Sequence, residues 1–213
     1  MKKYFNKNLL SYTLGILIST LGIVFCTKSD LGLSMIAATP YIFSRFFSES
    51  IPWITQGRAE YIWNLFIILV LAIVVKKWKW SYLLAFVTSF FVGTFIDLWL
   101  MILGKGIYET LALRVFMFVL GACLTSLGIA FYFRTTYPCQ AYELFVKEYA
   151  DKYKTDINKT KKYYDYITLL IDVILALVMF KSFVGVGLGT VFITILNSRM
   201  IALFSKILDK IGY

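Results

Sequence analysis

Three charged side chains interrupt long apolar stretches of this sequence. Asp172 lies in LLIDVI and Arg199 in LNSRM, while Asp97 follows Thr94 by three residues. Ionisable groups are costly in apolar surroundings, which makes each of the three a candidate for binding a polar solute or an ion. Two alternatives stay open: Asp172 and Arg199 form a buried ion pair that fixes helix register, and Asp97 lies near a wet membrane boundary.

Uncharged polar residues complete this candidate binding set, namely Asn64, Thr94, Thr190 and Asn197. Each threonine directly follows a glycine, and glycine can unwind a helix so that exposed carbonyl groups and the threonine hydroxyl coordinate an ion. The favoured alternative is that these glycines permit close helix packing. The same packing is expected of two matching sets of small residues: Gly15, Ser19 and Gly22, and Gly121, Thr125 and Gly128. The run GVGLGT lacks the lysine of a phosphate loop.

The composition argues against several kinds of chemistry. The chain has no His, and Cys26, Cys123 and Cys139 show no paired spacing, so we expect no metal site, no disulfide and no nucleophile paired with a base. An enzyme and a bound cofactor are therefore not expected. The net charge of +10 comes from basic residues at the ends of apolar runs, which indicates membrane topology and no nucleic acid partner.

The elements that position the candidate residues are apolar segments of membrane-spanning length. The chain is 60% hydrophobic and 16% charged, a composition typical of proteins embedded in a lipid bilayer. Six segments are expected to span it as helices: residues 9–26, 61–75, 82–103, 112–133, 164–180 and 183–205. With short loops they exhaust the chain, so we expect a single membrane domain over residues 1–213.

An internal repeat relates the two halves of the chain. The pattern LG, five residues, LGI, one residue and F begins at Leu14 and again at Leu120, an offset of 106 residues. Each copy carries three spans, so the second copy would be inverted relative to the first. We predict an all-α integral membrane protein with six transmembrane helices arranged as two inverted three-helix repeats, residues 9–104 and 112–207.

Each repeat also contains an extra segment, residues 31–47 and residues 138–153. Both are predicted to be either amphipathic helices at the membrane surface or partly inserted segments. The Pro40 and Gly32 breaks favour insertion of the first, and the charges of the second favour the surface. Glu60 and Asp165 occupy matching places, and we expect both to be solvated acids near helix starts.

The distribution of basic residues predicts the orientation. Most of the 22 Lys and Arg residues fall on one side of the membrane if the N-terminus is cytoplasmic, and basic loops stay inside. We therefore expect both termini to be cytoplasmic.

Three stretches carry a resemblance to a known family. LGIVFCTKSDLGLS near the start, its echo LGIAFYFRTTYPCQAYELF and the late GVGLGTVFITIL resemble the YczE/YitT-like bacterial membrane proteins. The resemblance implies a multispanning protein of the bacterial inner membrane and little about activity. This sequence departs from the pattern where Tyr137 and Pro138 stand in the second repeat at the place of Leu31 and Gly32.

Three functions remain open, and the first is preferred. The chain is expected to be a permease for a small molecule or an ion, coupled to protons or another cation, with its site at the interface of the two repeats. The alternatives are a substrate-binding membrane subunit of a larger, vitamin-importer-like transporter and a membrane regulator or scaffold without transport activity. The sequence leaves open whether the chain acts alone, as a homodimer or with a partner membrane protein.

Overall fold

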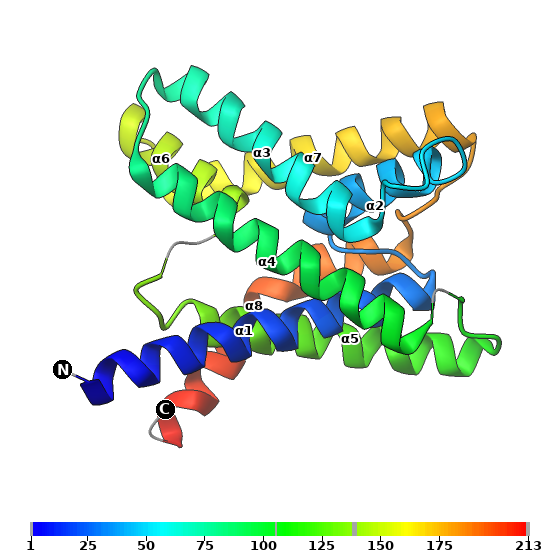
Figure 1. Ribbon diagram of the computed structural model, residues 1–213, viewed down its shortest axis with the longest axis horizontal. Helices are drawn as coiled ribbons and strands as arrows, with labels where there is room; N and C mark the ends of the chain where they lie inside the picture. The colour runs from blue at the N-terminus through cyan, green and yellow to red at the C-terminus, as the bar shows by residue number, and fades with distance from the viewer. Residues whose placement is uncertain (1, 105, 138–139, 212–213) are drawn as a thin grey trace. The chain divides into compact units, whose positions relative to one another are not determined.

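The computed structural model describes residues 2–104, 106–137 and 140–211 (Figure 1). Cys139 and the first residue of the second extra segment lie outside the described residues. The described chain contains eight helices and no strand: α1 (Lys2–Ser29), α2 (Met35–Phe47), α3 (Gln56–Val75), α4 (Trp80–Leu103), α5 (Leu111–Tyr132), α6 (Ala141–Tyr153), α7 (Ile157–Phe180) and α8 (Leu188–Lys210).

Six of these helices are long and apolar enough to cross a bilayer, which confirms the predicted spans. They are α3, α4, α5, α7, α8 and the part of α1 from Asn8 to Ser29. The 13-residue helices α2 and α6 reach only about 20 Å at 1.5 Å per residue. These two helices are the extra segments of the predicted repeats.

The last span begins later than predicted, at Leu188 instead of residue 183. Gly185 has a positive φ of 75°, and its carbonyl accepts a hydrogen bond from the Leu33 N–H at 3.0 Å. The Leu31 carbonyl accepts a second bond from the Gly189 N–H, also at 3.0 Å. The glycine run is therefore a junction that packs against the loop after α1, and its backbone groups are engaged there.

The helices form two compact units, and each unit draws on both predicted repeats. Unit 1 comprises Met1–Ser34, Phe95–Tyr137 and Gly185–Tyr213, and unit 2 comprises Met35–Thr94 and Pro138–Val184. Helix α4 continues from unit 2 into unit 1 after Thr94. The extra helices α2 and α6 both belong to unit 2, together with α3 and α7.

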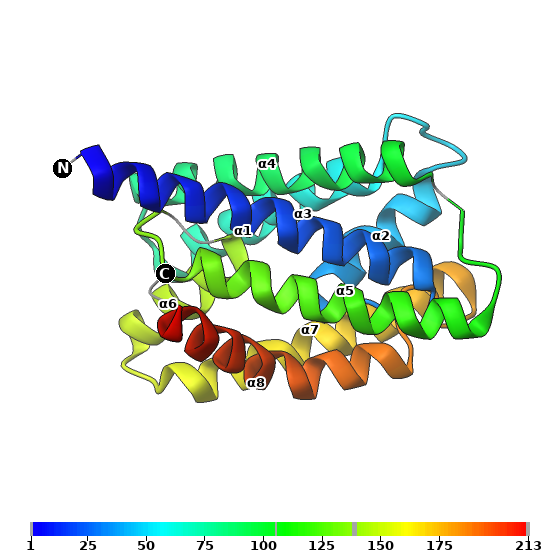
Figure 2. The same cartoon turned by 90° about the horizontal axis from the view of Figure 1, so that it is seen from below.

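In unit 1, helices α1 and α5 run side by side in close contact (Figure 2). A Cβ added to Gly22 would lie 2.5 Å from the Gly121 carbonyl oxygen, and one added to Gly15 would lie 2.9 Å from that of Gly128. Because the earlier glycine of α1 faces the later glycine of α5, the two helices are antiparallel. The predicted close packing of the small residues is confirmed at this crossing.

Two basic side chains of unit 1 bind the C-terminal ends of helices. Lys28 Nζ donates to the carbonyls of Leu103 and Gly104 at 2.9 and 2.7 Å, at the end of α4. Arg134 Nη2 donates to the Ser205 carbonyl at 2.6 Å, near the end of α8. Cations are favourable at helix C-termini because the last carbonyl groups have no partner within the helix.

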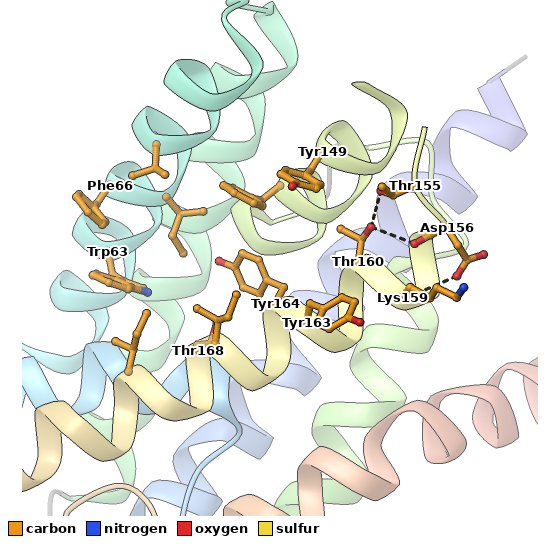
Figure 3. Close-up of a pocket in the computed structure, with 15 residues that line it drawn as sticks. Trp63, Phe66, Tyr149, Thr155, Asp156, Lys159, Thr160, Tyr163, Tyr164 and Thr168 are labelled. Carbon is orange, nitrogen blue, oxygen red and sulfur yellow. Dashed lines mark hydrogen bonds between the residues drawn. The ribbon is translucent and has the colours of Figure 1, made fainter. Parts of the chain in front are cut away.

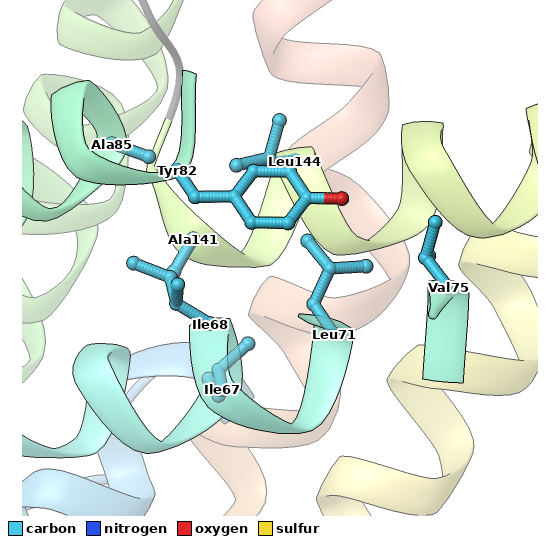
Figure 4. Packing of buried hydrophobic residues seen from close by; sticks show 8 residues of the cluster. All are labelled: Ile67, Ile68, Leu71, Val75, Tyr82, Ala85, Ala141 and Leu144. Atoms are coloured by element: carbon cyan, nitrogen blue, oxygen red, sulfur yellow. The ribbon is translucent and has the colours of Figure 1, made fainter. Parts of the chain in front are cut away.

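In unit 2, four helices contact one another in a closed order, with α2 against α3, α3 against α6, α6 against α7 and α7 against α2. An apolar cluster fixes α3, α6 and the start of α4 (Figure 4). It consists of Ile67, Ile68, Leu71, Val75, Tyr82, Ala85, Ala141 and Leu144. Polar side chains on the remaining faces of these helices form the candidate site.

Candidate functional site

Besides Glu148, which pairs with Lys79, unit 2 contains four carboxyl groups that are wholly or partly withdrawn from the surface. Glu60 comes from α3, Glu143 from α6, and Asp165 and Asp172 from α7; we call these four residues the acidic cluster. Among the described residues of unit 2 no Lys or Arg is buried. An unpaired charge in an apolar interior is costly, so these acids need protons, hydrogen bonds or a cation.

Asp172 is completely buried on α7. Its Oδ1 accepts a hydrogen bond from the hydroxyl of Thr39 on α2, and Thr39 is completely buried as well. Asp172 Oδ2 has no hydrogen-bond partner among the described residues. One oxygen of this carboxyl group is therefore held in place, and the other is open to a donor.

Glu60 and Asn64 form a second buried pair one turn apart on α3. Glu60 is 3% exposed and Asn64 1% exposed, so the predicted solvated acid at position 60 is wrong. The Asn64 amide donates to Glu60 Oε1 at 3.0 Å and to the Glu60 carbonyl at 2.9 Å. Neighbouring helices cover this first turn of α3, and Asn64 Oδ1 remains without a partner among the described residues.

Glu143 on α6 connects two other acids of the cluster. It interacts electrostatically with Glu60 on α3 and with Asp165 and Lys161 on α7. Asp165 Oδ1 accepts a hydrogen bond from the hydroxyl of Tyr142, whereas Glu143 Oε2 is buried without a partner in the described part of the chain. Burial raises the pKa of Glu143 to about 7.

The raised pKa of Glu143 predicts a pH dependence of stability. The unfolded chain releases this proton near pH 4.5 and the folded chain only near pH 7, so the free energy of unfolding should fall between these values and level off above pH 7. We expect the unfolding midpoint in detergent to drop across this window and the drop to be smaller in Glu143→Gln. Equal pH profiles for the two proteins would contradict this prediction.

An aromatic-lined cavity of about 790 Å³ lies beside these acids (Figure 3). Its walls come from α3, α6 and α7, and six aromatic residues line it: Trp63, Phe66, Phe145, Tyr149, Tyr163 and Tyr164. The Tyr164 ring stands 5.0 Å from the ring of Tyr142 and 5.1 Å from that of Phe145. Tyr164 also interacts electrostatically with Glu143, Asp165 and Asp172, so it belongs both to the cavity wall and to the surroundings of the acidic cluster.

The structure divides the residues predicted from sequence between the two units. Asp172 and Asn64 lie in unit 2 with the acidic cluster, and so does Thr94, whose exposed hydroxyl donates to the Phe90 carbonyl of its own helix at 2.8 Å. Unit 1 contains the other four predicted residues: Asp97, Thr190, Asn197 and Arg199. The predicted set is therefore not one site within a single unit.

The four residues of unit 1 have different surroundings. Thr190 is buried and caps α8, because its hydroxyl accepts from the Gly187 N–H at 3.1 Å. Asn197 Oδ1 accepts from the Ser126 hydroxyl at 3.0 Å. Asp97 is half-buried, and Arg199 is exposed on α8. The ion pair of Arg199 with Asp172 stays a prediction, since these residues belong to different units.

Sequence reasoning overlooked Glu143, Tyr142, Tyr164 and Thr39 as functional residues. Glu143 stands in a charged segment that reads as a surface helix, so its burial was not foreseeable from composition. One signal was available, because Glu60 and Asp165 occupy matching places in the two repeats. Matching acids in a repeat with few acidic residues indicate a shared environment, which the structure shows to be the interior of unit 2.

The fold is that of a helical protein with six helices long and apolar enough to span a membrane. Within that class, residues 6–206 match the model of DUF6198, a family of unknown function, and the chain belongs to this family. It is similar to the uncharacterized protein YyaS of Bacillus subtilis (strain 168), with 28% identity over 203 residues that cover 93% of this chain and 92% of YyaS. No solved structure gives a significant match. The resemblance to YczE/YitT-like proteins stays a prediction.

Proposed function

We propose that this protein is a permease for a small solute, coupled to protons or to another cation, and that the acidic cluster of unit 2 is its coupling site. The observation that carries the proposal is a set of buried oxygens that receive no hydrogen bond from the residues the structure describes: Asn64 Oδ1, Glu143 Oε2 and Asp172 Oδ2. They come from three helices, and every one of them is a hydrogen-bond acceptor when the acids are ionised. Binding and release of a proton or a cation would alternately satisfy and expose these groups.

The inverted repeat is part of the proposal, and the helix contacts support it. Gly15 contacts Gly128, and Gly22 contacts Gly121. Gly121 is the residue that corresponds to Gly15 at the repeat offset of 106, and Gly128 corresponds to Gly22 in the same way. The antiparallel crossing of α1 and α5 is thus symmetric in sequence. In unit 2, α2 and α3 of the first repeat correspond to α6 and α7 of the second. The contact of α2 with α3 corresponds to that of α6 with α7, and the contact of α3 with α6 corresponds to that of α7 with α2.

Matching residues in the two halves also serve matching purposes. Lys28 and Arg134 are separated by the repeat offset of 106, and they bind the ends of α4 and α8, the last helices of their repeats. Lys76 and Lys181 are separated by 105 and have left-handed backbone conformations at the C-caps of α3 and α7. Two inverted copies of one three-helix unit would produce both correspondences.

The position of the acidic cluster agrees with a site between the repeats. Helices α2 and α3 belong to the first repeat and α6 and α7 to the second, and all four contribute to the cluster or its hydrogen bonds. Many secondary transporters bind substrate and coupling ion between their inverted repeats. We further propose a location in the bacterial inner membrane with both termini cytoplasmic, as the basic residues favour, and no enzymatic activity.

The alternative functions receive less support. A binding subunit needs a helix face on which its partner docks, and the glycines on the small-residue face of α1 are already occupied by α5. A regulator acting through the second extra segment would present α6 at the surface. Helix α6 instead packs against α3 and α7 and buries Tyr142, Leu144 and Val146.

Transport currents test the proposal directly. The full chain would be reconstituted in proteoliposomes on a solid-supported membrane and exposed to ammonium and alkylammonium ions, amino acids, organic anions and sugars. We expect at least one class to evoke a saturable current whose size changes with an imposed pH or sodium gradient. The absence of current from every class, with correctly folded protein in the vesicles, would contradict the permease.

A further inference from the structure

The aromatic cavity has the size and lining of a small-molecule site. Its volume of about 790 Å³ falls in the range of roughly 300 to 1,000 Å³ that is typical of ligand pockets. The charged residues among those that line it are Asp156 and Lys159, and the Asp156 side chain accepts from the Lys159 N–H at 2.9 Å. Most of the surface offered to a ligand is therefore aromatic or aliphatic.

Two residues of the cavity wall are exposed on candidate membrane spans. Phe66 on α3 is 52% exposed and Tyr163 on α7 is 68% exposed, and both helices are candidate membrane spans. Exposed apolar side chains of a spanning helix contact lipid. A solute that partitions into the membrane can reach the cavity from the side.

The charges behind the cavity wall select the sign of the ligand. Tyr164 lines the cavity and interacts electrostatically with Glu143, Asp165 and Asp172. The basic side chain that interacts with this group from α7 is Lys161, which is half-buried. Carboxylates therefore outnumber the basic group around Glu143, which favours a positively charged ligand. The faces of the aromatic rings that line the cavity also attract cations.

We propose that the aromatic cavity binds a lipophilic organic cation, with the apolar part of the ligand against Trp63 and Phe145 and its positive charge directed toward Tyr164 and the carboxylates behind it. The inference rests on the proposed permease function and names its substrate class. A cation in this position would supply positive charge to buried acceptors for which residues 2–104, 106–137 and 140–211 provide no donor, Glu143 Oε2 above all. In the described part of the chain no three acidic or cysteine side chains are grouped closely enough to hold a metal ion, and an extended organic cation does not require such grouping.

Binding should depend on pH through Glu143. This carboxyl group faces Glu60 from α3, Tyr142 from its own helix, and Lys161, Tyr164 and Asp165 from α7. Its proton is lost near pH 7, so the negative charge that attracts the ligand is present at pH 8 and absent at pH 5.5. The affinity for the cation should rise between these two values.

Two ions of the same size and opposite charge test this inference. Binding of radiolabelled tetraphenylphosphonium, a cation, and of tetraphenylborate, an anion, would be measured separately on the full chain in nanodiscs of phosphatidylcholine. We expect saturable binding of the phosphonium ion at one site and only partition into lipid for the borate ion. Glu143→Gln should weaken phosphonium binding about tenfold and reduce its pH dependence, and Phe66→Leu should weaken it several-fold.

Matched variants separate the cavity from general effects. Glu148→Gln changes the same residue type on the same helix, but Glu148 pairs with Lys79 at 2.6 Å and does not line the cavity. Phe91→Leu removes a ring that is 45% exposed on α4, away from the cavity lining. Both should bind phosphonium like the unmodified protein.

Four results would overturn the inference. Equal binding of the two ions would indicate a groove that selects only for apolarity, and unchanged affinity in Glu143→Gln would remove the carboxylates from recognition. A phospholipid that stays bound in native mass spectrometry and is not displaced by phosphonium would identify lipid as the occupant. If phosphonium fails to bind while another solute evokes coupled currents, the permease stands and only the substrate class is wrong.

Discussion

Replacing Asp172 with Asn is expected to abolish solute-driven, coupled transport while leaving the protein folded. Asp172 is completely buried, and one of its oxygens has no partner in the described chain. The amide has nearly the same shape and still accepts a hydrogen bond from Thr39, but it neither carries a charge nor exchanges a proton. Transport currents should fall by about a hundredfold or more, the size of effect expected when a group that must change its charge in each cycle is lost.

The folded state should tolerate this change. An isolated carboxylate is costly to bury, so a neutral amide at position 172 should leave the unfolding midpoint unchanged or raise it. Asp151→Asn is the matched control, because Asp151 on α6 has a side chain that is 75% exposed and forms a salt bridge with Lys154, three residues away. This control should transport normally.

Thr39→Val distinguishes the position of Asp172 from its charge. The valine keeps the volume of the side chain but removes the donor to Asp172 Oδ1. We expect about a tenfold loss of transport, since a hydrogen bond to a charged group contributes about 1.5 to 3 kcal/mol.

Unimpaired coupled transport by Asp172→Asn would exclude Asp172 from the mechanism.

Adding a methyl group at the crossing of α1 and α5 is expected to produce a large loss of stability. In Gly22→Ala the new Cβ would lie 2.5 Å from the Gly121 carbonyl oxygen and from the Thr125 backbone nitrogen. These are backbone atoms of a helix, so relief requires the two helices to separate. Overpacking of this kind costs about 1 to 3 kcal/mol, which exceeds the gain of about 1 kcal/mol from the higher helix propensity of alanine.

The symmetry of the crossing makes a second variant informative. Gly128→Ala places a Cβ 2.5 Å from the Ser19 backbone nitrogen and 2.6 Å from the Gly15 carbonyl oxygen, and it should destabilise the protein by a similar amount. Gly106→Ala is the control, because no atom lies within 4 Å of its added Cβ. Free energies of unfolding would be measured by denaturation in mixed detergent micelles. Equal stability of all three variants would contradict the close crossing.

The sequence predicted the number of spans and the helix packing well because both depend on local composition. Apolar runs of membrane length can satisfy their backbone groups only as helices, and the six candidate spans agree with this expectation. The small residues of α1 and α5 were assigned correctly because glycine at helical spacing has few other uses in a bilayer. The start of α8 was placed too early, since an apolar sequence continues through the loop at Gly185 and only the contacts with Leu31 and Leu33 interrupt the helix.

The candidate site was predicted only in part, through Asp172 and Asn64. The apolar residues next to Asp172 in the sequence predict that it is buried, and this prediction does not require knowing which helices surround it. Glu60 and Glu143 lack such neighbours, because each stands near a helix start in a more polar stretch. Their burial arises from helices that are distant in sequence and pack over them.

By itself the sequence determined six helices long and apolar enough to span a membrane, the small residues of α1 and α5 that allow close helix contact, and one buried acid. Periodicity, length and the cost of polar groups in lipid suffice for these features, since all of them act along a single helix. Only the tertiary structure brought α2, α3, α6 and α7 together, joined four acids from three of these helices into one cluster, and formed the aromatic cavity beside them. A binding site depends on side chains that converge from separate helices, and the spacing of residues along one chain does not determine which helix faces meet.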